Sequence, residues 1–160
     1  MSGGLLIRNR QRAKTINTRL LKTLVKTLLE ELLELEDFNL VIYLVGATEM
    51  AQLNEKFLRH TGSTDVITFD YLDPRSSTLS LHGEIFVCVD DALTQSGQFR
   101  TSWQSELARY AIHGVLHLLG FDDIRAADRR KMKREENRLL REVTRLFPLS
   151  KLGTRSRLAA

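Results

Sequence analysis

The chain has 160 residues, of which 42% are hydrophobic and 28% are charged, so it is long enough to bury one core and too apolar to be disordered. Its longest apolar stretches, residues 40–45 and 112–119, are too short to cross a bilayer, and the single cysteine, Cys88, excludes an internal disulfide. The net charge of +4 is modest, so composition alone identifies no partner. We expect a cytoplasmic protein that makes no membrane contact.

The first half of the chain alternates between strand-like and helix-like patterns. A short apolar run at residues 5–8 fits an edge strand. Residues 15–35 repeat leucine at helical spacing and predict an amphipathic helix. The β-rich residues 38–45 predict a strand, a helix follows over residues 48–58, and residues 65–69 predict another strand.

The second half begins with a polar segment and then holds one strand and three helices. Residues 70–80, with an Asp-Pro pair and several serines and threonines, predict a surface loop. Residues 83–89 predict a strand, and residues 91–99, 102–119 and 128–146 predict helices. Because strands and helices alternate irregularly, we expect an α+β fold in which helices pack on a small mixed sheet of about four strands.

The chain shows no internal repeat and no linker long enough to divide it. We therefore expect a single domain over residues 1–149. The last residues, 150–160, predict a flexible C-terminal tail.

The strongest chemical signal is the segment from His113 to Asp123, HGVLHLLGFDD. His113 and His117 are four residues apart, so both imidazoles lie on one face of a helix and can reach one metal ion. Gly120 can adopt the left-handed conformation that ends a helix, and the chain then returns Asp122 or Asp123 toward the same ion. Two nitrogens and one carboxylate oxygen, with a fourth position open, are typical of catalytic zinc sites.

Two histidines on an apolar helix could instead be hydrogen-bonded core residues. Without partners, their buried polar atoms would cost about 1–3 kcal/mol each, and a metal removes that cost. Gly114 limits the chemistry, because metallopeptidases of the H-E-x-x-H type carry their general base at this position. Gly120 and a third ligand at residue 123 keep the metzincin spacing without that base, so a peptidase is disfavoured.

Charge is unevenly distributed along the chain. Seven basic residues and no acid precede Glu30, whereas residues 30–55 hold seven acids and no base. Residues 124–145 carry nine bases against four acids. Basic clusters beside a hydrolytic site favour a polyanion such as nucleic acid as the partner. For the C-terminal cluster alone, a solvated helix face is an equally good explanation.

Four blocks of the chain resemble the YbeY family, zinc-dependent endoribonucleases that mature and police ribosomal RNA in bacteria. The family motif H-G-x-L-H-L-x-G-[YF]-D-H matches residues 113–123, with Asp123 where the family has its third histidine. Arg59 and residues 64–69 match an arginine followed by T-D-V-L-S-F. Residues 81–85 match L-G-[DE]-I with His82 inserted, and residues 132–136 match M-x-x-x-E-E. The resemblance extends from about residue 7 to residue 140.

The resemblance implies a reduced zincin-like fold, with a mixed four-stranded sheet and the metal helix beneath it. It also implies a single-strand-specific endoribonuclease that acts in 16S 3′-end processing and ribosome quality control. Ribosomal RNA and the small ribosomal subunit would be its partners. One Zn²⁺ per chain would be held by His113, His117 and Asp123. Arg59 would bind substrate phosphate and stabilise the transition state, and Asp122 would orient a ligand histidine or cap the turn.

The aspartate at position 123 leaves several alternatives open. A carboxylate is a competent zinc ligand, but it makes a bound water less acidic and suits manganese or iron as well. A weakened or lost site would instead make the chain a non-catalytic RNA- or ribosome-binding protein. Another zinc hydrolase would share the site but ignore RNA. Within the nuclease hypothesis, either a metal-activated water or the RNA 2′-OH could attack the phosphodiester.

Overall fold

The computed structural model describes residues 2–58, 64–76 and 79–153. Its strands are β1 (Ser2–Asn9), β2 (Asp37–Val45), β3 (Val66–Asp70) and β4 (Ser80–Cys88). Its α-helices are α1 (Thr18–Thr27), α2 (Ala47–Leu53), α3 (Val89–Phe99), α4 (Trp103–Leu118) and α5 (Ala126–Leu146). Each strand and helix predicted from the sequence is present in these ranges, with boundaries that differ by a few residues.

The four strands form one sheet in the order β1-β2-β4-β3. β1 pairs with β2 and β2 pairs with β4 in parallel, whereas β3 and β4 are antiparallel neighbours. The predicted α+β fold with a small mixed sheet is therefore confirmed.

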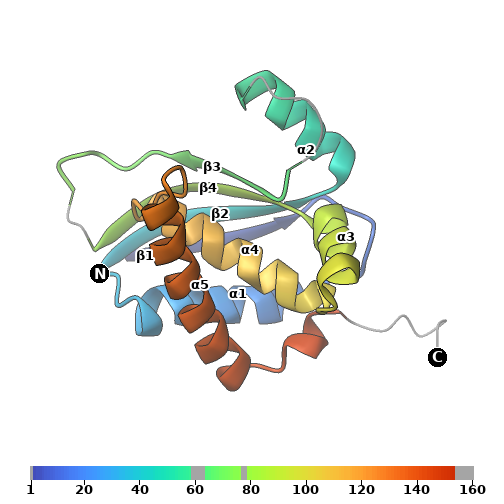
Figure 1. The fold of residues 1–160 in the computed structure, drawn as a ribbon. Helices are drawn as coiled ribbons and strands as arrows, with labels where there is room; N and C mark the ends of the chain where they lie inside the picture. The colour runs from blue at the N-terminus through green and yellow to red at the C-terminus, as the bar shows by residue number, and fades with distance from the viewer. Residues whose placement is uncertain (1, 59–63, 77–78, 154–160) are drawn as a thin grey trace.

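The helices cover the two faces of the sheet unequally. α1, α4 and α5 lie on one face, α3 lies at the end of the sheet, and α2 lies on the opposite side (Figure 1). Along β2, alternate side chains point into the main core and are almost fully buried: Phe38, Leu40, Ile42 and Leu44. This period of two matches a strand with one face against helices. No helix in the described ranges is long and apolar enough to cross a membrane.

α4 runs through the centre of the molecule and packs tightly on β4. A Cβ atom at Gly114 would lie 2.7 Å from Cγ2 of Ile85, so glycine allows the helix to approach the strand this closely. Ile112, Val115 and Leu116 of the same helix are fully buried. The absence of a side chain at position 114 is therefore a packing requirement as well as the loss of a possible general base.

We expect Gly114→Ala to lower the free energy of unfolding by about 1–3 kcal/mol, because the added methyl overpacks the contact with Ile85. Gly97 of α3 is the matched control, since a Cβ there would meet nothing within 4 Å. Gly97→Ala should stabilise by up to about 1 kcal/mol through helix propensity. Urea denaturation of both variants measures the difference; equal effects would mean that α4 can move away from β4 at no cost.

The structure differs from the sequence predictions at two helical ends. The helix predicted over residues 15–35 is α-helical only to Thr27 and continues as a π-helical turn, η1 (Leu28–Leu32). The helix predicted over residues 48–58 is α-helical only to Leu53 and likewise continues as a π-helical turn, η2 (Asn54–Leu58). Of the predicted flexible tail, residues 150–160, the structure describes the first residues. Leu149–Leu152 form a 3-10 turn, η3, with Leu152 fully buried, and Gly153 pairs with Ile16 in a β-bridge. The rest of that predicted tail, residues 154–160, lies outside the described residues.

Candidate metal centre

His113 and His117 lie on one face of α4, as their spacing predicts. Their ring centroids are 4.7 Å apart and the rings are nearly perpendicular. The two side chains are 23% and 29% exposed, so each ring is mostly buried and still open on one side. Ser102 caps the N-terminus of the helix, because its hydroxyl accepts a hydrogen bond from the backbone N–H of Ser105.

The end of α4 turns the chain back toward the histidines. Gly120 has a φ of +100°, the left-handed conformation expected for the residue after a helix. The N–H of Phe121 donates to the carbonyl of Leu116 and the N–H of Gly120 donates to the carbonyl of His117, both at 3.0 Å. This pair of bonds is a Schellman motif, which satisfies the last carbonyls of the helix and fixes the direction of the following loop.

Asp123 lies at the end of this loop, facing both imidazoles. Its Oδ2 is 3.5 Å from Nε2 of His117 and 3.8 Å from Nε2 of His113. Arg129 of α5 holds the loop in place, because its guanidinium donates to the carbonyl of Ile124 at 2.7 Å and to that of Asp123 at 3.4 Å.

The three side chains offer ligand atoms that all lie within 4.8 Å of one another. Ligands about 2.0–2.2 Å from a tetrahedral zinc are about 3.4 Å apart, so small rotations of Asp123 bring the three into range. Two imidazole nitrogens and a carboxylate are donors that zinc accepts. The residues present therefore fit a metal ion with three protein ligands and an open position.

Asp122 has a different role from that of Asp123. Its Oδ1 accepts a hydrogen bond of 3.0 Å from the N–H of Ile124, so this side chain caps the turn. Of the two roles expected for Asp122, the turn cap matches the contacts of the described residues. The carboxylate bonded to Nδ1 of a ligand histidine is that of Glu136. The role of Asp122 in orienting a histidine stays a prediction.

We expect Asp122→Asn to bind as much metal as the wild type, because the amide oxygen still caps the turn. Asp122→Ala should lower stability by about 1 kcal/mol through loss of the cap. Metal content and thermal unfolding of the two variants test this assignment. A loss of metal in Asp122→Asn would instead show that the negative charge of Asp122 acts on the site.

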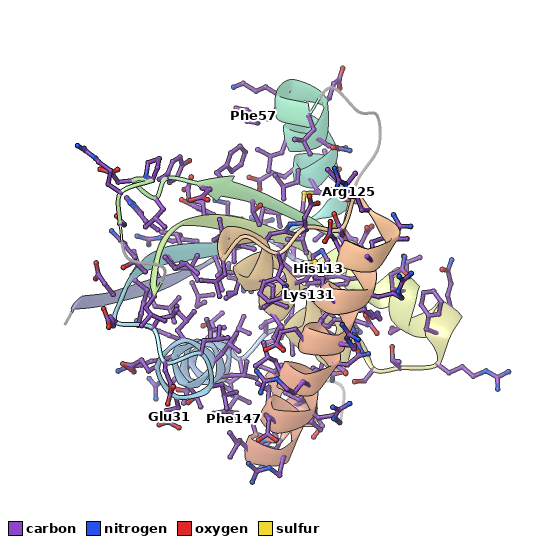
Figure 2. The ribbon with its side chains drawn as sticks, turned by 60° about the vertical axis from the view of Figure 1, so that its left-hand side comes forward. Glu31, Phe57, His113, Arg125, Lys131 and Phe147 are labelled. Carbon is purple, nitrogen blue, oxygen red and sulfur yellow. The ribbon has the colours of Figure 1, made fainter. Side chains whose placement is uncertain are left out.

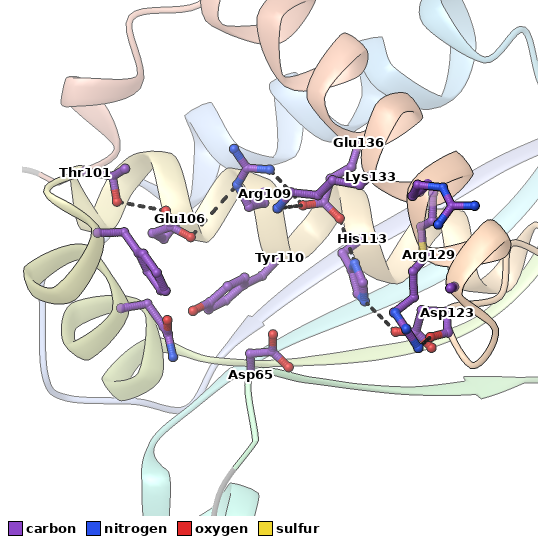
Figure 3. Close-up of a pocket in the computed structure, with 15 residues that line it drawn as sticks. Asp65, Thr101, Glu106, Arg109, Tyr110, His113, Asp123, Arg129, Lys133 and Glu136 are labelled. Atoms are coloured by element: carbon purple, nitrogen blue, oxygen red, sulfur yellow. Dashed lines mark hydrogen bonds and ion pairs between the residues drawn. The ribbon is translucent and has the colours of Figure 1, made fainter.

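Glu136 of α5 is the closest partner of the metal-site histidines. Its Oε2 is 2.7 Å from Nδ1 of His113, and the residue is only 4% exposed. Its other oxygen accepts a 2.8 Å hydrogen bond from Arg109, which also donates to Asn137. These polar contacts continue from Arg109 to Glu106, and from Glu106 to Thr101. They therefore form a chain of side chains that runs along α4 to His113 (Figure 3).

The contact with Glu136 decides the protonation of both groups. Burial alone lowers the pKa of His113, but the hydrogen bond to Glu136 and the carboxylates around it outweigh burial and leave that pKa raised. Burial likewise opposes ionisation of Glu136, yet the bonds from His113 and Arg109 leave its pKa lowered. The ionised Glu136 thus favours a proton on Nδ1 of His113 and accepts its hydrogen bond. Nε2 of His113 faces Asp123 and is the nitrogen that can bind a metal once it is deprotonated.

Sequence reasoning treated Glu136 only as part of a family block and of a charge count. The helical spacing of α5 could have identified Glu136, because it places this residue on the apolar face of the helix with Met132, Leu139 and Leu140. A carboxylate within a buried helix face needs a partner, and the histidines of α4 are the natural candidates.

Two other residues of the family blocks have different outcomes. Arg59, expected to bind phosphate, lies outside the described residues. Asp65 lies next to His113, on the wall of a cavity of about 800 Å³ beside the metal-site residues. The same cavity is lined by Tyr110, His113, Asp123, Arg130, Lys133 and others, so acidic, basic and aromatic groups all border it. A substrate that reaches the metal site has this space beside it.

Comparison with known proteins gives one consistent result. A family described as endoribonuclease YbeY matches residues 6–144. Proteins with that name include one from Chlorobium phaeovibrioides, 38% identical over 60% of this chain and 62% of its own. The Salinibacter ruber protein is 34% identical to this chain over 66% of this chain and 70% of its own length. The Bacteroides fragilis protein is 37% identical over 58% of this chain and 63% of its own length. The alignments therefore span less than two thirds of the Chlorobium and Bacteroides proteins.

A solved structure has a similar fold. The solution structure of TM1509 from Thermotoga maritima aligns with 86% of this chain and 88% of its own, at a TM-score of 0.61 and 28% identity. The family match covers most of the chain, and the Salinibacter relative aligns over more than two thirds of its length. The chain belongs to the endoribonuclease YbeY family.

Proposed function

We propose that this protein is a metal-dependent endoribonuclease that cleaves single-stranded ribosomal RNA. The observation that carries the proposal is the convergence of His113, His117 and Asp123, with the buried Glu136 behind His113. The relatives named endoribonuclease supply the reaction class. Within this proposal the substrate lies at the 3′ end of 16S RNA, and the enzyme acts in ribosome quality control on the small subunit, in the cytoplasm.

One Zn²⁺ per chain would be held by His113, His117 and Asp123. A metal bound there supplies Lewis-acid chemistry at a phosphate. The carboxylate of Asp123 also suits manganese or iron, so the identity of the ion is part of the test.

The protein's own side chains have separate tasks around this site. Glu136 keeps the Nδ1 proton on His113, which fixes the ring and leaves Nε2 free for the ion. Arg130 and Lys133 border the cavity, where they can neutralise the charge of a bound phosphate. The role of Arg59 as a phosphate-binding and catalytic residue stays a prediction.

The packing of Gly114 favours a nuclease over a peptidase. A general base after the first histidine would need a side chain at this position, and its Cβ would collide with Ile85. The side of α4 that bears position 114 therefore faces the sheet rather than the open side of the histidines.

The test is cleavage of a single-stranded RNA carrying the 3′ end of 16S RNA, beside the same RNA in a duplex. We expect cleavage of the single strand only, its loss with a chelator, and its return with added Zn²⁺ or Mn²⁺. The new ends distinguish the two routes, since attack by the 2′-OH leaves a 2′,3′-cyclic phosphate and attack by water does not. RNA binding without cleavage under all metal conditions would identify a non-catalytic RNA-binding protein instead.

A further inference from the structure

Two neighbouring hollows lie along α5, and one of them is beside the metal-site residues. The 800 Å³ cavity next to His113 is lined in part by Arg109, Arg130 and Lys133. A second hollow of about 590 Å³ lies between α4 and α5 and is lined by Arg109, Asn137, Leu140, Arg141, Thr144 and Arg145. Arg109 borders both, so the two hollows are neighbours, and together we call them the groove, which follows α5 from the histidines toward its C-terminal end. Figure 2 shows α5 crossing close to His113 and extending away from it to Phe147.

The charges of α5 are segregated around the helix. Its exposed or half-buried acids, Asp128, Glu135 and Glu142, are seven residues apart and therefore lie on one side. Residues 130, 133, 137, 141 and 144, at spacings of three and four, form another side. That side lines the groove, and its charged members are Arg130, Lys133 and Arg141. α5 thus presents positive charge to the groove and turns its three more exposed acids away.

The cations on the groove side are poorly compensated within the protein. Arg130 and Arg141 have no hydrogen bond or ion pair with any described residue. Three acids of other elements, Asp65, Glu106 and Asp123, also line the cavity. The acid that α5 itself contributes, Glu136, is buried and accepts hydrogen bonds from His113 and Arg109, and Lys133 reaches it only at 3.8 Å. By contrast, Arg138 lines neither hollow. It borders a third hollow on the solvent side of the helix, which Arg141 also borders, and it is bonded to the carboxylate of Glu135. The groove therefore offers guanidinium groups that form no hydrogen bond or ion pair within the described residues, although Arg141 still interacts electrostatically with Glu142. Such groups bind phosphate oxygens well.

We propose that an RNA strand bound at the metal site continues along this groove, with its phosphates on Arg130, Lys133 and Arg141. The inference rests on the proposed function and adds the path and the footprint of the substrate. Arg130 and Arg141 are eleven residues apart on one helix, about 16 Å along its axis. At about 3.4 Å for each stacked nucleotide, this length accommodates up to about five nucleotides on one side of the cleaved bond.

The path predicts which cations of α5 carry RNA affinity. Binding of a fluorescent eight-nucleotide single-stranded RNA is measured by anisotropy in a chelator, so that no cleavage occurs, over a range of salt concentrations. We expect Arg130→Gln/Arg141→Gln to weaken binding at least about tenfold. Its salt dependence, log K against log salt, should be shallower by about 1.4, since each lost contact with a single strand removes about 0.7.

The matched control is Lys131→Gln/Arg138→Gln, which removes the same charge from the solvent side of the same helix. It should bind with the wild-type salt slope. A four-nucleotide RNA should also lose less affinity than the eight-nucleotide RNA in the groove variant, because it reaches fewer of the cations.

Several results would overturn the proposed path. Equal losses in the two double variants would show that only the net charge matters, and a larger loss in the control would place RNA on the solvent side of α5. A wild-type protein that does not bind the RNA would also exclude it. Because binding is measured without metal, a protein that binds along the groove but never cleaves would refute the nuclease proposal and leave the path standing.

Discussion

Replacing Asp123 with alanine is expected to remove zinc from the purified protein, whereas Asp123→His should retain one zinc per chain. Asp123 supplies the third ligand atom, and the two imidazole nitrogens that remain leave the ion with too few protein ligands. Losing a direct ligand should cost more than the 10–100-fold in affinity that loss of an outer partner typically costs. Inductively coupled plasma mass spectrometry after dialysis against a weak chelator measures the metal content.

Thermal unfolding separates metal loss from misfolding. Metal-free wild type and metal-free Asp123→Ala should unfold at similar temperatures, because Asp123 lies on an exposed loop with a 44% exposed side chain. Added zinc should raise the unfolding temperature of the wild type only, since a ligand stabilises the state that binds it.

The outcomes of this experiment decide between the readings of the site. Full zinc in Asp123→Ala would remove Asp123 from the ligand set. No metal in the wild type, with zinc gained in Asp123→His, would mean that the native site has decayed, since histidine is the residue that the YbeY motif has there. The protein would then be an RNA-binding member of its family without a metal.

Local patterns predicted the strands, the helices and the histidine pair because each depends on residues close together in the chain. The β-rich composition of residues 38–45 predicts a strand, and the structure places β2 there. The turn at Gly120 depends on a single residue with a positive φ, which glycine adopts readily. Both features could be predicted from a few neighbouring positions.

Long-range packing could not be predicted in the same way. The order β1-β2-β4-β3 depends on which strands meet across dozens of residues, and no local period encodes it. Leu152 is buried because the chain returns to Ile16, more than 130 residues earlier. The mostly polar sequence around Leu152 does not indicate this packing. Glu136 contacts a histidine 23 residues away on another helix, and its role depends on how α4 and α5 cross.

Replacing Glu136 with glutamine is expected to weaken zinc binding about tenfold, and Glu136→Ala about 100-fold, the range found for residues that orient a ligand histidine. The amide oxygen of glutamine can still accept a hydrogen bond from the Nδ1–H of His113. The variant lacks the negative charge that makes the imidazole a stronger ligand. Alanine loses the acceptor as well and leaves Arg109 without this partner. Competition with a chromophoric zinc chelator measures both affinities.

Glu135→Gln is the control, because Glu135 is the neighbouring acid on α5 and its carboxylate pairs with Arg138 rather than with a histidine. It carries the same change of charge and should bind zinc as the wild type does. Equal losses in the two glutamine variants would show that net charge, not orientation of His113, explains the effect.

The pKa of His113 in the metal-free protein also tests the role of Glu136. A purely structural role of Glu136 would not predict that this pKa falls in Glu136→Gln. In the wild type, the carboxylate of Glu136 raises this pKa against the opposing effect of burial. In Glu136→Gln burial remains while the largest raising cause is weakened, so the pKa of His113 should fall. NMR titration of the imidazole tests the sign of this change.

A lower pKa of His113 also means that protons compete less with zinc for the imidazole. The loss of zinc affinity in Glu136→Gln, relative to the wild type, should therefore be smaller at acidic pH than at pH 8. An unchanged pKa would mean that Glu136 does not act on the imidazole, and the weaker zinc binding would then need another cause.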